Sequence, residues 1–234
     1  MIRKSIVTCL CLGGLVIGAA AIAQPSKDKP ASPAAPAAPA GMPGPEEMAK
    51  MMEAWQKSMT PGKMHEHLQK SVGKWDGKIK SWMAGPDAPP SESKGTTEIT
   101  GMMGGRFTRG ETKATFDLGD GQATPFEGFG IYGFNNTTEQ FECTWCDSFG
   151  TMMMHFTGKL SEDGKVLTWN SKFVDPMSGK ESWMRMTETW NGPDAMTLSM
   201  FQPGFDGKEM KMMEIAYTRV GGKPKTETKP AMTK

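Results

Sequence analysis

Short segments of alternating side chains, separated by turn residues, fill the chain from the triplet Gly73-Lys74-Trp75 to Arg219. The turn residues recur roughly every 8–12 positions, which is the spacing typical of an antiparallel β-sandwich or β-barrel. No helical pattern interrupts the series, so an up-and-down barrel is favoured over a Greek-key sandwich. A closed barrel has an interior, and binding is therefore the leading functional class. Strands are expected near residues 75–83, 93–101, 105–116, 126–134, 139–148, 151–160, 165–174, 181–190, 195–202 and 209–220.

Residues 1–23 have the pattern of a secretory signal peptide. Basic Arg3 and Lys4 precede an apolar run, and Ala21-Ile22-Ala23 forms a small-residue cleavage site. A transmembrane anchor is the alternative, but the apolar run is short for a membrane-spanning helix. We therefore expect an exported protein, periplasmic or secreted, with no stable membrane insertion after the signal is removed.

Composition divides the remaining chain into four parts. Residues 24–45 are rich in Pro and Ala and have too few apolar side chains to offset the entropy of ordering, so we expect a disordered linker. The same argument predicts a disordered tail at 221–234. Between them we expect a helical segment over 46–72 and a single barrel domain over 73–220.

Two short helices are expected in the helical segment. Met48, Met51, Met52 and Trp55 recur on one face of the first helix, and Pro61 suits the first turn of the second. These helices either cap one end of the barrel or pack against its outside, and the sequence leaves both arrangements open.

Charge and motif content argue against a nucleic-acid-binding protein and against an enzyme. The formal net charge of +1 provides no basic footprint for nucleic acid. The sequence has no Ser-His-Asp order, no pair of carboxylates in a shared apolar setting and no phosphate-binding loop, so an enzyme is not expected. Glu181, Glu188 and Glu214 fall on separate predicted strands, where we place them at solvent-facing positions.

Cys143 and Cys146 form a Cys-x-x-Cys pair within the strand expected at 139–148. Positions three apart on a strand point to opposite faces, so one thiol is expected to be buried and the other to lie on the outer face. A single pair also lacks the further ligands that zinc needs. A strained local disulfide is the alternative, because an exported protein meets oxidising conditions.

The same strand carries candidate binding residues. Phe141, Trp145 and Asp147 share one face of it, and that face has a buried character. Asp147, together with Arg106, is a candidate contact for a polar ligand group at the barrel mouth. The alternative is an Asx-type turn in which Asp147 caps the backbone that follows it.

Gly128 and Gly130 alternate along the preceding strand and face the same way as Tyr132. Glycines inside a strand mark a close approach by another group, which is either a ligand or the cross-strand ring of Trp145. Phe129 and Tyr132 have opposite phases, so only one of them can point inward. The candidate ligand-binding residues are Arg106, Phe129, Tyr132, Phe141, Trp145 and Asp147.

Methionine is frequent, with 22 residues in the chain. The cluster Met152-Met153-Met154-His155 offers soft ligands for copper, and His155 is the one histidine on a predicted strand that could be an axial haem ligand. However, consecutive strand residues face opposite ways and leucine is scarce, so methionine is expected to fill the core in place of leucine. No metal or cofactor is therefore expected, and a haem- or copper-binding barrel is kept as a lesser alternative.

Two motifs at the ends of the predicted barrel resemble those of the calycins, the lipocalins and fatty-acid-binding proteins. They are Gly73-Lys74-Trp75 on the first strand and Tyr217-Thr218-Arg219-Val220 on the last. The resemblance implies that Arg219 packs over Trp75 and closes one end of the barrel, a structural role for both residues.

A second resemblance covers residues 63–220. The chain is similar to the bacterial domain-of-unknown-function family 1579, which implies a calycin-like barrel, exported or cytosolic, with no assigned activity. The similarity rests on His65-x-x-Leu68, Gly73-x-Trp75, Gly104-Gly105-Arg106-Phe107, Phe126-x-Gly128-x-Gly130-x-Tyr132-Gly133-Phe134 and Trp145-Cys146-Asp147-Ser148.

These observations together predict a non-catalytic carrier or sensor of a small apolar or amphipathic molecule. The second hypothesis is a scaffold or envelope interaction protein whose barrel is filled by its own side chains. The third is the haem- or copper-binding barrel. The sequence defines neither the ligand nor the oligomeric state.

Overall fold

The computed structural model describes residues 43–82, 85, 87–117, 122–204 and 206–222. The chain divides into two units, Met1–Gly44 and Pro45–Lys234, and all of the strands and helices described below belong to the second. The expected signal peptide, nearly all of the expected linker and most of the expected tail lie outside the described residues.

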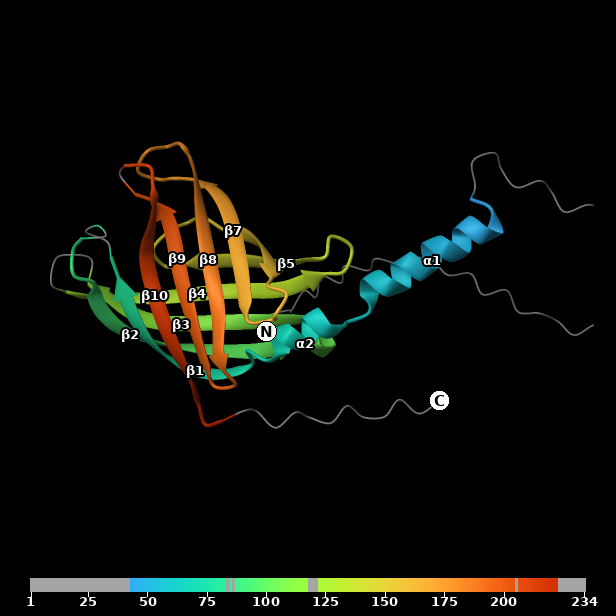
Figure 1. Ribbon diagram of the computed structural model, residues 1–234, viewed down its shortest axis with the longest axis horizontal. Helices are drawn as coiled ribbons and strands as arrows, with labels where there is room; N and C mark the ends of the chain where they lie inside the picture. Colours follow the sequence, from blue (N-terminus) through green and yellow to red (C-terminus); the bar gives the residue numbers. More distant parts are fainter. Residues whose placement is uncertain (1–42, 83–84, 86, 118–121, 205, 223–234) are drawn as a thin grey trace, which may run out of the picture. The chain divides into compact units, whose positions relative to one another are not determined.

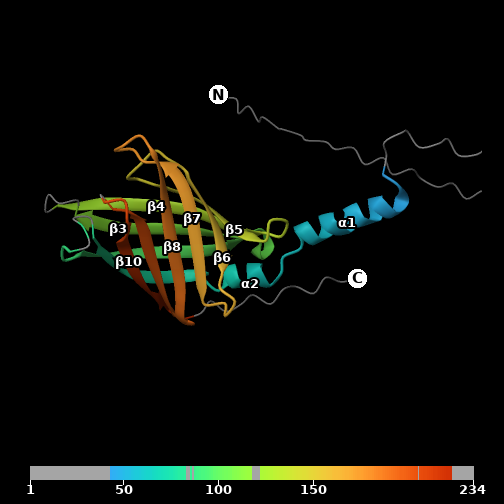
Figure 2. The ribbon, with the colours of Figure 1, turned by 45° about the horizontal axis from the view of Figure 1, so that its top comes forward.

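Ten antiparallel strands close into one up-and-down barrel, as Figures 1 and 2 show, and this confirms the predicted fold. Each strand pairs with its neighbours in the chain, and pairing of the first strand with the last closes the sheet, so the described strands leave no open edge. The strands are β1 Gly73–Ser81, β2 Ser91–Met102, β3 Phe107–Asp117, β4 Ala123–Asn135, β5 Gln140–Asp147, β6 Met154–Leu160, β7 Val166–Val174, β8 Glu181–Gly192, β9 Ala195–Pro203 and β10 Glu209–Val220.

Two strands begin two or more residues later than the sequence predicts. The strand expected from residue 105 starts at Phe107, because Met103–Gly105 forms a short 3-10 turn, η1, in which Gly104 has a φ of 66°. A backbone with positive φ cannot continue a β-ladder and suits glycine. The strand expected from residue 151 starts at Met154, where pairing between β5 and β6 begins opposite Trp145.

Side chains alternate between the barrel interior and solvent. In β1, Trp75 and Ile79 are buried, whereas Lys78 and Lys80 are exposed. Pairing of β1 with β10 sets Ile79 opposite Ile215, which is also buried. The period of two that predicted the strands therefore also determines which residues face the interior.

The two helices before the barrel have different environments. Helix α2, Lys63–Gln69, lies at one end of the barrel and buries His67 and Leu68, so it caps that end (Figures 1 and 2). Helix α1, Pro45–Met59, buries none of its residues, and its Trp55 is 56% exposed. The capping arrangement is thus correct for α2, and α1 contributes nothing to the core.

A cluster of buried side chains fills the barrel at the α2 end. Its members come from α2 and strands β5 to β7, and they are Leu68, Phe141, Cys143, Phe156, Leu167 and Trp169. His67 meets the ring of Phe141 edge to face, with centroids 5.9 Å apart. The packed core therefore lies against the cap.

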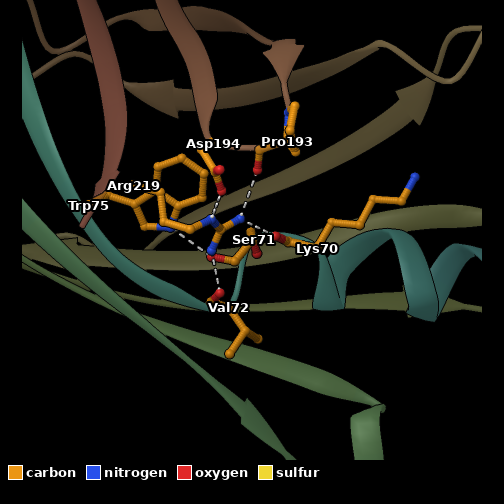
Figure 3. A network of polar contacts seen from close by, with 7 residues as sticks. All are labelled: Lys70, Ser71, Val72, Trp75, Pro193, Asp194 and Arg219. Carbon is orange, nitrogen blue, oxygen red and sulfur yellow. Dashed lines mark hydrogen bonds and ion pairs between the residues drawn. The ribbon is translucent and has the colours of Figure 1, made fainter. Parts of the chain in front are cut away.

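Arg219 links the last strand to the segment between α2 and β1 (Figure 3). Its guanidinium carbon lies 4.0 Å from the ring centroid of Trp75. Its nitrogens donate to the backbone carbonyls of Val72 at 2.5 Å and Lys70 at 2.7 Å, and to the carboxylate of Asp194 at 2.9 Å. The charge is buried and each guanidinium nitrogen donates a hydrogen bond, which offsets part of the cost of desolvating it and links β10 to the segment that follows α2.

Candidate functional site: a cavity inside the barrel

The interior of the barrel beyond the packed core is a cavity of about 350 Å³. Its lining runs from His67 on α2 to Phe149, which lies after β5 at the opposite, open end. Phe116, Phe126 and Phe149 meet edge to face at that end, with centroids 5.0 to 5.7 Å apart. The volume falls within the range of small-molecule sites.

Methionine side chains make up much of the cavity wall. Those in the lining are Met154, Met184, Met186, Met196, Met200 and Met213. Methionine is flexible and polarisable, so such a wall adapts to apolar ligands of different shape. The clustered Met152 and Met153 are instead exposed, because they lie in the connection before β6 and not on the strand itself.

Glu188 lies inside the barrel wall, and its placement corrects the sequence-based expectation of a solvent-facing side chain. It lies on β8, paired with Leu167 and Leu198, and lines the cavity. Burial raises the pKa of Glu188 to about 7, and a hydrogen bond from Trp169 acts in the opposite direction. The surface that Glu188 keeps accessible is therefore cavity surface.

The other two glutamates that were placed on solvated faces do lie outside. Glu181 forms an ion pair with Lys172 at 3.0 Å, and Glu214 forms one with Lys211 at 2.6 Å. A sequence signal for Glu188 existed, because Met184, Met186, Glu188 and Trp190 occupy one phase of β8. Of these four positions, all except the carboxylate are apolar.

The chain has two tyrosines, Tyr132 and Tyr217, and both line the cavity near Glu188. Burial raises the pKa of each phenol, and the charge of Glu188 raises both further. Tyr132 interacts with Cys143, whose own pKa burial raises to about 12. Phenols and thiol are therefore neutral near pH 7, and Glu188 is the group among them that titrates there.

Basic side chains do not contribute charge to this cavity. Among the described residues that line it, none is a lysine or an arginine. His67 lines the capped end, but burial lowers its pKa to about 4, so the imidazole is neutral. Its Nε2 is buried without a hydrogen-bond partner among the described residues.

The candidate binding residues separate into inner and outer groups. Tyr132, Trp145 and Asp147 line the cavity, and Phe141 is buried in the adjoining core cluster. Phe129 is 37% exposed and lies on the outer face. Tyr132, which has the opposite strand phase, therefore points inward.

Arg106 does not approach Asp147, which corrects the expected polar pair at the mouth. Arg106 lies by the capped end, where it donates to the carbonyl of Met59 at 3.0 Å. Asp147 lies opposite Gly128, five positions along β4 from Gly133, the partner of Phe107. Opposite charges suggested the pair, but the two side chains lie at different heights along the barrel.

Asp147 instead forms the Asx-type turn that was the alternative. Its carboxylate accepts hydrogen bonds from the backbone N–H of Phe149 at 3.0 Å and from the indole of Trp145 at 2.8 Å. These bonds fix the Trp145 ring against the wall at the open end.

Trp145 occupies the space beside the strand glycines. A Cβ atom at Gly128 would lie 2.3 Å from the Trp145 ring, and one at Gly130 would lie 2.9 Å from it. Of the two explanations for these glycines, the cross-strand ring is the one that the structure shows.

Both cysteines of the Cys-x-x-Cys pair are free, so the local disulfide is not formed. Cys143 is buried in the interior, and Cys146 lies opposite Phe129 on the outer phase. This is the division that the strand geometry predicted.

Residues 60–219 match the family described as "Protein of unknown function (DUF1579)". The chain belongs to this family. Among solved structures, Rv2717c from M. tuberculosis is 15% identical, with a TM-score of 0.51, over 69% of this chain and 99% of that one. A redesigned β-barrel is 12% identical, with a TM-score of 0.33, over 67% and 94% of the two chains. No curated protein matches. The likeness to Rv2717c shows a shared fold alone.

The residues that suggested haem or copper are dispersed in this DUF1579 protein. His155 is exposed on β6 and lies 3.0 Å from the hydroxyl of Thr144, so it does not face the cavity. Among the described residues, no three His, Cys, Asp or Glu side chains are grouped to hold a metal ion. Within the same residues, no helix has the length and apolar character needed to cross a membrane.

The DUF1579 cavity thus combines an apolar wall with one polar zone. The wall suits a hydrocarbon or aromatic body, and the zone around Glu188, Tyr132 and Tyr217 offers hydrogen-bonding groups. The arrangement can hold and orient a molecule.

Proposed function

We propose that this DUF1579 protein is a non-catalytic carrier or sensor that binds a small apolar or amphipathic molecule inside its barrel. The cavity of about 350 Å³, enclosed by ten strands and α2, is the observation that carries the proposal. Burying an apolar chain there removes it from water, which should make the binding free energy more favourable by about 0.8 kcal/mol for each methylene group.

Export is part of the proposal and is supported by the sequence of residues 1–23. A basic start, an apolar run and a small-residue cleavage site predict a mature chain that begins at Gln24. Mass spectrometry of protein recovered from outside the cytoplasm tests this. A mature N-terminus at Gln24 supports export, whereas an intact Met1 in all fractions contradicts it.

Binding can be tested with a homologous series of alcohols and isothermal titration calorimetry. Each added methylene should tighten the dissociation constant by about fourfold, until the chain outgrows the cavity. A constant affinity along the series, or no binding, would favour the filled-barrel hypothesis, in which the protein acts through its outer surface.

A matched pair of variants on β3 assigns the binding to the interior. Ala114 lines the cavity, and its neighbour Thr115 is exposed on the outside. Ala114→Trp should abolish alcohol binding, whereas Thr115→Trp should leave it unchanged. Circular dichroism checks that each variant is folded, and Ala114→Leu provides a smaller obstruction if the tryptophan is not accommodated.

A further inference from the structure

The charged groups in the described lining of the cavity all have the same sign. Glu188 lies in the wall, and Asp117 and Asp147 lie at the open end. The described lining contains no lysine or arginine, and His67 is neutral. Arg219 is outside the lining, where its guanidinium is hydrogen-bonded to Asp194 and to backbone carbonyls.

Glu188 has hydrogen-bonding capacity that its contacts with the described residues do not use. Two carboxylate oxygens can accept about four hydrogen bonds, whereas the indole of Trp169 is the one described hydrogen-bonding group that lowers the pKa of Glu188. Glu188 lines the cavity and keeps part of its surface accessible there. A ligand that carries positive charge would satisfy this carboxylate.

Aromatic rings surround the same point. The ring centroids of Tyr132 and Trp169 lie 6.0 Å apart, and the rings meet nearly edge to face. Tyr217 is close enough for the charge of Glu188 to raise the pKa of its phenol. Aromatic faces attract cations, most strongly when the cation is shielded from water. An ammonium group with apolar substituents is weakly hydrated, so it loses little on entering such a site.

An anionic ligand meets the opposite situation. A fatty-acid carboxylate in this cavity would face Glu188 and have no basic side chain of the described lining to pair with. An unpaired charge is costly to bury, and a second charge of the same sign nearby increases the cost.

We infer that the cavity selects hydrophobic ammonium ions over fatty acids, with the positive group against Glu188 and the apolar chain among the methionines. This inference rests on the proposed function and specifies its ligand class.

Three probes of equal chain length test it: decyltrimethylammonium, decanoate and decanol. They are titrated at pH 8 into the mature full-length protein by calorimetry. The ammonium ion should bind about tenfold more tightly than decanol, and decanoate should bind more weakly than decanol. Decanoate binding as tightly as the ammonium ion would overturn the inference.

Two variants on β8 locate the selectivity. Glu188→Gln keeps the shape of the side chain and removes its charge, so the preference for ammonium over decanol should disappear while decanol still binds. Glu181→Gln removes an exposed carboxylate from the same strand and should keep the preference. A preference that persists in Glu188→Gln would assign it to groups other than Glu188 and overturn the inference.

The outcomes separate this inference from the function on which it rests. Decanol binding without a preference for the ammonium ion overturns the ligand class and leaves the carrier intact. Failure of all three probes overturns both.

Discussion

Inside the barrel, the indole of Trp169 lowers the pKa of the Glu188 carboxyl, against the larger and opposite effect of burial. Trp169 itself is 2% exposed and belongs to the packed core, so this interaction joins the core to the cavity wall. A favourable interaction with one indole offsets only part of the cost of desolvating a carboxylate. The remaining cost appears as a pKa for Glu188 of about 7.

Glu188 should therefore make the stability of the protein depend on pH. Its folded pKa of about 7 lies above the ordinary value of 4.5, so the native state binds the proton more tightly than the unfolded state. The stability from this site is fully present below pH 4.5 and is lost as pH rises through 7. The shift corresponds to a loss on the order of 3 kcal/mol.

Urea unfolding of the wild type and of Glu188→Gln at pH 5 and pH 8 measures this contribution. The variant should gain stability relative to the wild type as pH rises, because glutamine has no proton to lose. Other titrating groups such as His67 are common to both proteins and cancel in the comparison. An equal difference at the two pH values would show that Glu188 does not titrate between them.

Gly128 should not tolerate even one added carbon. A Cβ there would lie 2.3 Å from the ring of Trp145, so the indole has to move and its hydrogen bond to Asp147 is strained. Gly128→Ala should lower the free energy of unfolding by about 1–3 kcal/mol. At Gly192 a Cβ meets nothing within 4 Å, so Gly192→Ala is the matched control and should change stability little.

Thermal and urea unfolding compare the two alanine variants. Near-ultraviolet circular dichroism should also change for Gly128→Ala, because the Trp145 ring is displaced. Equal stability of the two variants would mean that the ring moves freely, and that Gly128 is not needed to seat it.

Arg219→Ala should destabilise the α2 end of the barrel. The substitution leaves the carbonyls of Lys70 and Val72 without this donor and removes the cation over Trp75. Loss of a buried, hydrogen-bonded charge costs about 3–5 kcal/mol, and the half-exposed Asp194 places the expected value at the lower end.

Arg109→Ala is the control for Arg219→Ala, since Arg109 forms an exposed ion pair with Glu111 at 3.2 Å. Such pairs contribute about 0–1 kcal/mol. Hydrogen exchange should show that Arg219→Ala raises the exchange of amides in α2 and β1 most. Uniform exchange across the barrel, or a loss no larger than that of Arg109→Ala, would contradict a closing role for this residue.

The sequence was sufficient for the fold because every strand carries the same local signal. The alternation in Trp75–Ser81 and the turns between segments set the strand number, and up-and-down pairing follows from short connections. The beginning of β3 was placed two residues early because Gly105 has a positive φ and Arg106 a helical backbone, which the alternation of residue types does not reveal.

The candidate site was predicted in part, for a related reason. Strand phase correctly placed Trp145 and Asp147 on the same face of β5. Phase does not give the position along the barrel axis, so the expected pairing of Arg106 with Asp147 was wrong. Glu188 was assigned by residue type, although the strand phase of Met184 and Met186 places it inside. The cavity itself depends on how side chains from ten strands fill one cross-section, which no local pattern encodes.

The preference for ammonium ions should follow the ionisation of Glu188. The titratable groups that face it are Tyr132 on β4, Cys143 on β5 and Tyr217 on β10, and burial keeps all three neutral well above pH 7. Decyltrimethylammonium has no proton to exchange, so a change in its affinity near neutral pH reports the protein. Affinity should rise as pH increases from 6 to 8 and reach a plateau above the pKa of about 7.

Decanol serves as the reference ligand, since a neutral chain has no charge for Glu188 to attract. Its affinity should vary little over the same range, and Glu188→Gln should remove the pH dependence for the ammonium ion. Proton release during the titration at pH 7, measured in two buffers of different ionisation enthalpy, provides an independent readout. Ammonium binding that is independent of pH and releases no proton would show that the ion does not reach the carboxylate of Glu188.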